Sequence, residues 1–368
     1  MRKRIKVLHL GYEYIDRYFS LQHECAKAYD LSDDFEVTEV YLFGEAPAGH
    51  SNLQSGKLVC YNFPKSQIRL IPFKPLKKLL KLCREREFDV LVCHRYKPAY
   101  VAGWLSKFYK FKKIITVFHG LGEFRRLSRG IFFKYFLPDA IKAGVSEAVR
   151  KDILENVPGA GDNDTITLYN AMDLEALRRN YRSRDAARAE LGLPTDKFVF
   201  GSIGRLVAKK GYQNLIDAVS NIERDDFCVA IIGDGNYRGE LERQIKRKNL
   251  EGRVMLCGWS DEASSYVKAF DTFILPSLSE GFGLVFIEAM AAGVPCIGTD
   301  SGGVREVLAG AGVVIPCDDV DAIEKALIDD LAKSDQEREE ARQCHLQRVE
   351  MFSIDKLRAM YCKVAYLD

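Results

Sequence analysis

The chain has 368 residues, of which 47% are hydrophobic and 29% charged, and its formal net charge is +2. This length suggests two domains with an ordinary core in each, and the composition is typical of a soluble globular protein. No run of about 18 apolar residues occurs, and the apolar run after the basic N-terminus is too short for a signal peptide. The ten cysteines form no CxxC pair. They therefore suit buried thiols in a reducing cytosol better than a zinc site or a disulfide framework.

The small net charge hides an uneven distribution along the chain. Residues 1–170 carry 28 Lys/Arg and 19 Asp/Glu, a net of +9, whereas residues 171–368 carry 26 and 33, a net of −7. Basic residues gather in segments 65–87, 107–113 and 125–136, and aromatic residues interleave in the last two. Several interpretations are open. The segments could be solvated helix faces, or they could form a surface that meets an anionic membrane or an acidic acceptor. Segment 65–87 could also be a mobile lid. No nucleic-acid-binding motif accompanies them, so we expect no nucleic-acid partner.

Short apolar strands alternate with helical patterns throughout. Val/Ile-rich strands separated by helices are typical of parallel sheets covered on both faces. The sequence therefore predicts an α/β fold with two doubly wound, Rossmann-like domains. Such sheets bind ligands at the carboxyl ends of their strands, so we expect an active site in a cleft between two facing sheets. The expected strands are 5–10, 35–43, 89–94, 113–120 and 140–146, then 197–206, 228–235, 254–258, 272–277, 295–299 and 312–316.

The domain boundaries follow from the same pattern. We expect an N-terminal domain at residues 1–172 and a C-terminal domain at residues 197–348. Between them, residues 173–196 are polar and helical and end in Gly and Pro, which indicates a linker region. Residues 349–368 predict an amphipathic C-terminal helix.

The stretch SLSEGFGLVFIEAMAAG, which begins at Ser277, carries two carboxylates in different settings. Glu280 lies in a glycine-rich turn after a strand, and a helix is expected to begin near Leu284. The free N–H groups and the dipole of such a helix favour an anion such as a diphosphate. Glu288 lies inside this helix among apolar neighbours, where an unpaired carboxylate is costly. Either a basic residue pairs with it, or it accepts two hydrogen bonds from the vicinal hydroxyls of a ribose.

Two other glycine-rich turns follow strands. GSIGRLVAKKG (201–211) places Arg205 and the Lys209/Lys210 pair beside a strand end, which suits a phosphate clamp or a plain basic loop. In AIIGDG, Gly233 belongs to a tight turn that fits a flat base or close packing. The turn is not GxGxxG, and no acidic residue follows about 20 positions later at a strand end, which argues against a nicotinamide dinucleotide site.

His119 follows the apolar strand of TVFHGLGEF and precedes a glycine. A lone histidine is commonly a satisfied structural residue. Its place at a strand end, where ligands bind in parallel sheets, favours a functional role.

Taken together, these stretches resemble retaining glycosyltransferases of family four, which have the GT-B fold. The resemblance covers roughly residues 85–310, and its string of motifs is specific although each motif alone is not. It implies that the C-terminal helix crosses back to the N-terminal domain. The motifs are SEGFGLVFIE with its Glu-x7-Glu spacing, GRLVAKKG, IIGDG, VMLCGW, AGVSEAVRKDI, LYNAMD and GTDSGGVREVL.

The resemblance implies a role for each matching residue. Arg205 and Lys210 would hold the donor's diphosphate and stabilise it as it leaves. Glu288 would hold the ribose hydroxyls, Glu280 the hydroxyls of the donor sugar, and His119 would lie near the sugar's reacting face. The further donor-binding positions are Gly204, Gly233, Gly281, Phe282, Gly283 and Leu284.

The implied reaction is a retaining transfer from a nucleotide-diphosphate sugar, with no metal and no cofactor. Cations and a helix N-terminus would neutralise the leaving diphosphate. An oxocarbenium-like state would form, and the acceptor hydroxyl would attack the same face. Glu280 and Glu288 are not a glycosidase pair, because Glu288 is assigned to the ribose.

The loop after the first strand departs from the family pattern. Many members have a Gly-Gly turn there, whereas residues 10–20 are LGYEYIDRYFS. On the acceptor side we expect Tyr12, Glu13, Tyr14, His94 and Arg95.

The function expected from this pattern is a hexosyltransferase that elongates a cell-envelope glycan such as lipopolysaccharide core, O-antigen or capsule. The basic N-terminal domain suggests a cytoplasmic enzyme in peripheral contact with the inner face of the membrane. A soluble nucleotide-sugar transferase that makes a small glycoside or a storage polymer is one alternative. A catalytically silent binding module with the same fold is another.

Overall fold

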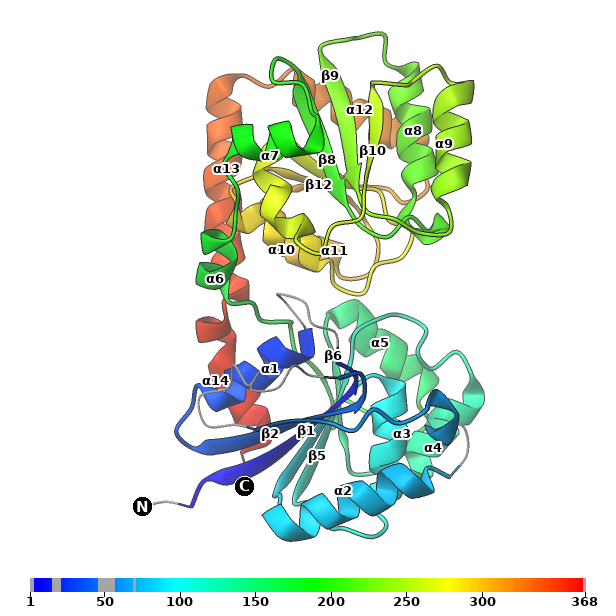
Figure 1. Ribbon diagram of the computed structural model, residues 1–368, viewed down its shortest axis with the longest axis vertical. Coiled ribbons are helices and arrows are strands. Elements are labelled where there is room, and N and C mark those ends of the chain that lie inside the picture. The colour runs from blue at the N-terminus through cyan, green and yellow to red at the C-terminus, as the bar shows by residue number, and fades with distance from the viewer. Residues whose placement is uncertain (1–2, 15–20, 46–56, 69–70, 367–368) are drawn as a thin grey trace. The chain divides into compact units, whose positions relative to one another are not determined.

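The computed structural model describes residues 3–14, 21–45, 57–68 and 71–366. The chain divides into two compact units. The first unit comprises residues 1–172 and 354–368, and the second unit comprises residues 173–353. Each is built on a parallel sheet, of seven strands in the first unit and six in the second as far as the structure describes them (Figure 1). The predicted α/β fold with two doubly wound domains is therefore confirmed.

The first sheet has the strand order β3-β2-β1-β4-β5-β6-β7. The chain winds outward from the centre in both directions, so the switch point lies between β1 and β4. The edge strands β3 and β7 were not expected from the sequence, because KLVC and TIT are too short to give a pattern. The strands are β1 (Ile5–Glu13), β2 (Phe35–Phe43), β3 (Lys57–Cys60), β4 (Val90–His94), β5 (Lys113–Phe118), β6 (Ile141–Gly144) and β7 (Thr165–Thr167).

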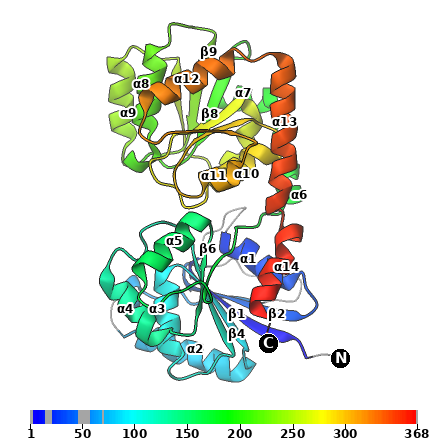
Figure 2. The same cartoon turned by 180° about the vertical axis from the view of Figure 1, so that it is seen from behind.

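Helices cover both faces of this sheet. On one face α1 packs against the C-terminal helix α14, and on the other α3 lies between α2 and α4 (Figures 1 and 2). The helices of the first unit are α1 (Leu21–Asp30), α2 (Phe73–Arg86), α3 (Tyr96–Leu105), α4 (Leu127–Phe136), α5 (Glu147–Asn156) and α14 (Ile354–Ala365), with the short 3-10 helix η1 (Lys65–Ile68).

The C-terminal helix is anchored within the first unit. Tyr361 is 1% exposed, and its hydroxyl donates a hydrogen bond of 2.7 Å to the carbonyl of Tyr169. The helix begins at Ile354 rather than at 349, because α13 (Asp335–Val349) ends there and a 3-10 turn, η4 (Glu350–Phe352), follows.

The second sheet has the strand order β10-β9-β8-β11-β12-β13. All six apolar segments predicted for this half of the chain form strands. The connections leave β8 and β11 in opposite directions, so the switch point of this sheet lies between these neighbours. The strands are β8 (Phe198–Ile203), β9 (Phe227–Ile232), β10 (Val254–Gly258), β11 (Thr272–Leu275), β12 (Cys296–Thr299) and β13 (Val313–Ile315).

Helices of the second unit also lie on both faces of its sheet. On one face α8 packs against α9 and α12, and on the other α10 packs against α13 (Figures 1 and 2). Besides α13 and η4, the helices of the second unit are α6 (Leu174–Arg179), α7 (Arg184–Leu191), η2 (Ala208–Lys210), α8 (Tyr212–Asn221), α9 (Arg238–Arg247), η3 (Ala263–Ala269), α10 (Leu284–Ala291), α11 (Val304–Leu308) and α12 (Val320–Leu331).

Residues 173–196, which the sequence assigns to a linker region, form α6 and α7 and belong to the second unit. The side chain of Arg188 in α7 is fully buried. Its guanidinium donates to the Asp271 carboxylate at 2.7 Å and to the Ala269 carbonyl at 2.9 Å. It also reaches the carbonyls of Pro194, Thr195 and Lys197. A charge buried in this way is tolerated because its donors are satisfied.

We expect Arg188→Ala to lower the free energy of unfolding of the second unit by about 1–3 kcal/mol, because several carbonyls lose their donor. The Asp271 carboxylate keeps its contacts with Arg184 and the Val199 amide. Urea titration with hydrogen exchange of the β8 amides measures this loss. Arg224→Ala is the control, since Arg224 forms an exposed surface pair with Asp226. Equal urea midpoints for the two variants would contradict the structural importance of Arg188.

Candidate functional site

The loops that follow β8 and β11 meet at the switch point of the second sheet. The Lys210 ammonium forms an ion pair of 2.6 Å with the Glu280 carboxylate, and their side chains are only 13% and 19% exposed. The amide of Leu278 donates to the carbonyl of Lys209 at 2.8 Å, which joins the two loops through the backbone as well. The structure therefore brings together two of the residues predicted for the site.

Close backbone contacts require glycine at this edge of the sheet. A Cβ atom on Gly211, which has a φ of +69°, would lie 1.9 Å from the carbonyl oxygen of Pro276. On Gly233, with a φ of +152°, it would lie 2.0 Å from the carbonyl oxygen of Gly204. A Cβ atom on Gly204 would lie 2.7 Å from the hydroxyl oxygen of Tyr212. Close packing thus accounts for Gly204 and Gly233, and their predicted contacts with a donor remain predictions.

Arg205 extends from the same loop into solvent. Its neighbour Leu206 is buried, and the amide of Leu206 donates to the carbonyl of Asp234 at 2.9 Å. The exposed Arg205 side chain forms no ion pair or side-chain hydrogen bond with any other residue that the structure describes. A cation held on a fixed backbone without an internal partner is available to an anionic ligand.

The helix α10 begins at Leu284, directly after Gly283, where the predicted anion site lies. Gly283 has a φ of +93° and precedes the helix without a side-chain cap, so the first N–H groups have no capping side chain. A Cβ atom there would lie 2.8 Å from the ring of Phe286, which adds a steric reason for glycine. Phe282, predicted with Gly281 and Leu284 to bind the donor, is 3% exposed and packs against Phe352. Its side chain is part of the core, and only its backbone can face a ligand.

Glu288 lies one turn into α10 and is part-buried. Removal from water raises the pKa of its carboxyl group to about 7. Among the described residues no hydrogen bond or ion pair reaches this carboxylate, whereas its backbone carbonyl accepts a bond of 2.6 Å from the Tyr181 hydroxyl. The structural pair with a basic residue, which the sequence left open, does not form within the described chain.

Three histidines form a buried chain at the centre of the first sheet. The Nδ1 of His94 lies 2.8 Å from the Nε2 of His119, and the Nε2 of His94 lies 3.0 Å from the Nε2 of His9. Burial lowers the pKa of His9 and His94 well below the usual range and lowers that of His119 to about 3. Neutral imidazoles have one donor and one acceptor nitrogen each, so the tautomers of the three rings are coupled.

His9 is not among the residues predicted from the sequence. The available signal was that the three adjacent strands each have a histidine: His9 in the middle of β1, His94 at the end of β4 and His119 directly after β5. His94, predicted on the acceptor side, is 2% exposed, and both of its ring nitrogens are engaged in the chain. The contact between the His94 and His119 rings by itself accounts for a histidine at position 119. The contact of His119 with a donor sugar remains a prediction.

The other predicted acceptor residues lie at the carboxyl edge of the first sheet. The Tyr12 ring packs against Phe43, and the Tyr14 ring against Tyr41. The Glu13 carboxylate pairs with Lys65 at 3.3 Å. Arg95 is exposed and precedes α3 with a φ of +68°. Residues 15–20 of the predicted acceptor loop lie outside the described residues.

The described part of the chain contains no group of three or more His, Cys, Asp or Glu side chains placed to hold a metal ion. Within the same residues, no helix has the length and apolar character needed to cross a membrane.

The raised pKa of Glu288 predicts a pH-dependent stability. An unfolded glutamate titrates near 4.3, so between about pH 4.3 and pH 7 the folded state binds more protons than the unfolded state. The free energy of unfolding should therefore fall as the pH rises through this window. The substitution Glu288→Gln should remove this contribution. The free energy of unfolding of the variant, relative to that of the unsubstituted protein, should therefore increase as the pH rises.

Urea midpoints measured at about pH 5, 6, 7 and 8 test this expectation. The control is Glu251→Gln at an exposed glutamate, which should leave the pH profile unchanged. A constant difference between Glu288→Gln and the unsubstituted protein at all pH values would show that Glu288 titrates normally.

Part of the second unit is similar to a known protein family. Residues 183–348 match the family described as Glycosyl transferases group 1. The chain is 30% identical to N-acetyl-alpha-D-glucosaminyl L-malate synthase of Bacillus anthracis over 63% of the chain and 61% of that relative. It is 26% identical to UDP-Gal:alpha-D-GlcNAc-diphosphoundecaprenol alpha-1,3-galactosyltransferase of Escherichia coli over 69% of each. Across the curated relatives, the match spans between 38% and 70% of the relative's own length.

The fold is also that of solved structures. The chain aligns with Alr3699/HepE of Anabaena in complex with UDP with a TM-score of 0.78 and 19% identity, over 98% of this chain and 99% of that one. At this identity the likeness shows the fold, which is the GT-B fold of two Rossmann-like domains. The match to the group 1 glycosyltransferase family covers residues 183–348, which is less than half of the chain.

Proposed function

We propose that the protein transfers a sugar from a nucleotide-diphosphate sugar to a hydroxyl group of a cell-envelope glycan. The observation that carries the donor half of this proposal is the Glu288 carboxylate. It has no described partner, and it lies one turn inside a helix whose first N–H groups are uncapped. The Lys210–Glu280 pair joins the loops at the switch point of the same sheet. A carboxylate, a helix N-terminus and cations together match a ribose and a diphosphate.

The donor would be held by contacts that the free protein leaves open. The diphosphate would lie at the N-terminus of α10, where Arg205 and Lys210 add positive charge. Glu288 would accept two hydrogen bonds from the ribose hydroxyls. Glu280 would exchange part of its contact with Lys210 for hydroxyls of the donor sugar.

Uridine is the first base to test. HepE of Anabaena was solved with UDP, and the name of the Escherichia coli relative specifies a UDP-linked galactose. Charge neutralisation by Arg205, Lys210 and the helix dipole would support departure of the diphosphate without a metal. Retention at the anomeric carbon and a place for His119 beside the donor sugar follow from the resemblance to family four.

The envelope acceptor is supported by relatives. The Escherichia coli relative is named for a sugar carried on diphosphoundecaprenol, a lipid-linked acceptor. The protein would then work at the cytoplasmic face of the membrane, in peripheral contact with it. The Bacillus anthracis relative, named for a glucosaminyl malate, favours the alternative of a small soluble glycoside.

We expect UDP to bind the purified protein with micromolar affinity in calorimetry without added metal, and more tightly than GDP or ADP. Glu288→Ala should weaken this binding about tenfold or more, because it removes hydrogen bonds to a charged group. Glu251→Ala, at an exposed position of the same unit, is the matched control and should bind UDP normally.

The two ways in which this experiment can fail are distinct. Failure of all three nucleotides to bind would overturn the donor site and favour a catalytically silent module. Normal UDP binding by Glu288→Ala would keep the donor site but remove the ribose role of Glu288.

A further inference from the structure

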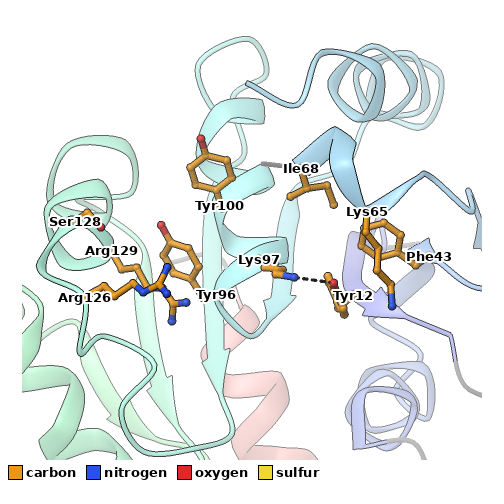
Figure 3. Close-up of a pocket in the computed structure, with 10 residues that line it drawn as sticks. All are labelled: Tyr12, Phe43, Lys65, Ile68, Tyr96, Lys97, Tyr100, Arg126, Ser128 and Arg129. Carbon is orange, nitrogen blue, oxygen red and sulfur yellow. Dashed lines mark hydrogen bonds between the residues drawn. The ribbon is translucent and has the colours of Figure 1, made fainter. Parts of the chain in front are cut away.

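A pocket of about 460 Å³ opens in the first unit (Figure 3). Such a volume suits a small polar ligand or one to two sugar residues. It lies beside the β1/β4 switch point, because Tyr12 is in β1 and Tyr96 and Lys97 begin the helix after β4. Its lining is aromatic and basic and contains no carboxylate: Tyr12, Phe43, Lys65, Ile68, Tyr96, Lys97, Tyr100, Arg126, Ser128 and Arg129.

Few ion pairs compensate the positive charge in this pocket, and the Glu123 carboxyl group interacts with Arg129 only at longer range. Lys65 pairs with Glu13 at 3.3 Å. Within the described chain, Lys97, Arg126 and Arg129 have no carboxylate within the 4.0 Å of an ion pair. Gathering like charges around one cavity is unfavourable unless an anion occupies it.

Contacts within the pocket hold two of these cations in place. The Lys97 ammonium donates to the Tyr12 hydroxyl at 2.8 Å and lies 4.6 Å from the centroid of that ring (Figure 3). The Arg129 guanidinium lies 4.6 Å from the centroid of the Tyr96 ring and donates to the carbonyl of Glu123 at 2.5 Å. Figure 3 also shows Arg126 beside Arg129. The cations are therefore oriented before a ligand arrives, which lowers the entropic cost of binding.

The aromatic residues indicate what carries the anion. Tyr12, Tyr96 and Tyr100 contribute flat apolar surfaces with hydroxyl groups, which suit the C–H faces and hydroxyls of a sugar. Arginine forks bind phosphate oxygens in pairs, and three unpaired cations match the charge of a phosphate or diphosphate group.

We propose that this pocket binds the phosphate or diphosphate group of a phosphorylated sugar acceptor. The inference rests on the proposed glycosyltransferase function and names the class of its acceptor. Tyr12, expected on the acceptor side from the sequence, lines the pocket, and Glu13 positions Lys65 at its rim. The phosphate could belong to a lipid headgroup or to a soluble phosphorylated glycan.

The test uses the intact protein saturated with UDP, so that the donor site does not compete for the probe. Glucose 1-phosphate and inorganic pyrophosphate are titrated by calorimetry, and sedimentation follows binding to phosphatidylcholine vesicles with and without phosphatidylglycerol. We expect Lys97→Ala, Arg126→Ala and Arg129→Ala each to weaken phosphate binding about tenfold, and Arg129→Lys to retain part of it. Lys134→Ala is the control, because Lys134 is exposed on the same helix as Arg129.

The outcomes separate the possible ligands. Binding of glucose 1-phosphate that is lost in the pocket variants supports a soluble phosphorylated acceptor. Vesicle binding that requires phosphatidylglycerol and the pocket cations supports a lipid phosphate. Absence of binding in both arms, or equal binding by Lys97→Ala and Lys134→Ala, would overturn the proposal. A second UDP that is lost in Lys97→Ala would also overturn it, because the pocket would then be a nucleotide site.

Failure of this inference is distinguishable from failure of the proposed function. If the donor site is wrong, UDP does not bind, and the probes are then titrated against the protein without UDP. The pocket variants should leave UDP affinity unchanged, since every substituted residue belongs to the first unit.

Discussion

Close backbone packing at the carboxyl edge of the second sheet is the constraint on which the candidate donor site depends. The backbone at Gly211 lies against the carbonyl of Pro276, and the backbone at Gly233 lies against that of Gly204. No side chain larger than hydrogen fits at Gly211 or Gly233. Because the turns occupy so little space, the loops after β8 and β11 converge, and Lys210 meets Glu280. Gly233, which the resemblance assigns to donor binding, therefore also has a structural role in the packing of these loops.

Two charged side chains of the second unit have different surroundings. Arg188 shows how the chain treats a buried charge that only supports the fold, since its donors reach carbonyls or the Asp271 carboxylate. Glu288 is treated differently, because its carboxylate lacks any described partner and its pKa is raised to about 7. This contrast supports our proposal that the Glu288 carboxylate takes its hydrogen-bond partners from a ligand.

The sequence predicted the features that depend on local pattern. The apolar strands, the start of α10 near Leu284 and the glycine turns are encoded within a few residues each, so they could be recognised directly. The edge strands KLVC and TIT could not, because pairing with a neighbour rather than their own composition makes them strands. The chain of His9, His94 and His119 also escaped prediction, since only the order of strands in the sheet brings the three rings together.

The basic segments of the first half show the same limit in a different form. Charge counting left several interpretations open: solvated faces, a membrane surface, an acidic acceptor and, for residues 65–87, a lid. In the structure, the basic residues of these segments lie in different surroundings. Lys65, Arg126 and Arg129 line one pocket together with Lys97. Others, such as Lys81 and Lys134, are exposed to solvent. The sequence does not show which cations lie close together, and cations around one pocket create a stronger local field than the same number spread over a surface. Four of the basic residues of the first half therefore share one pocket, and our acceptor proposal rests on these converging cations rather than on the net charge.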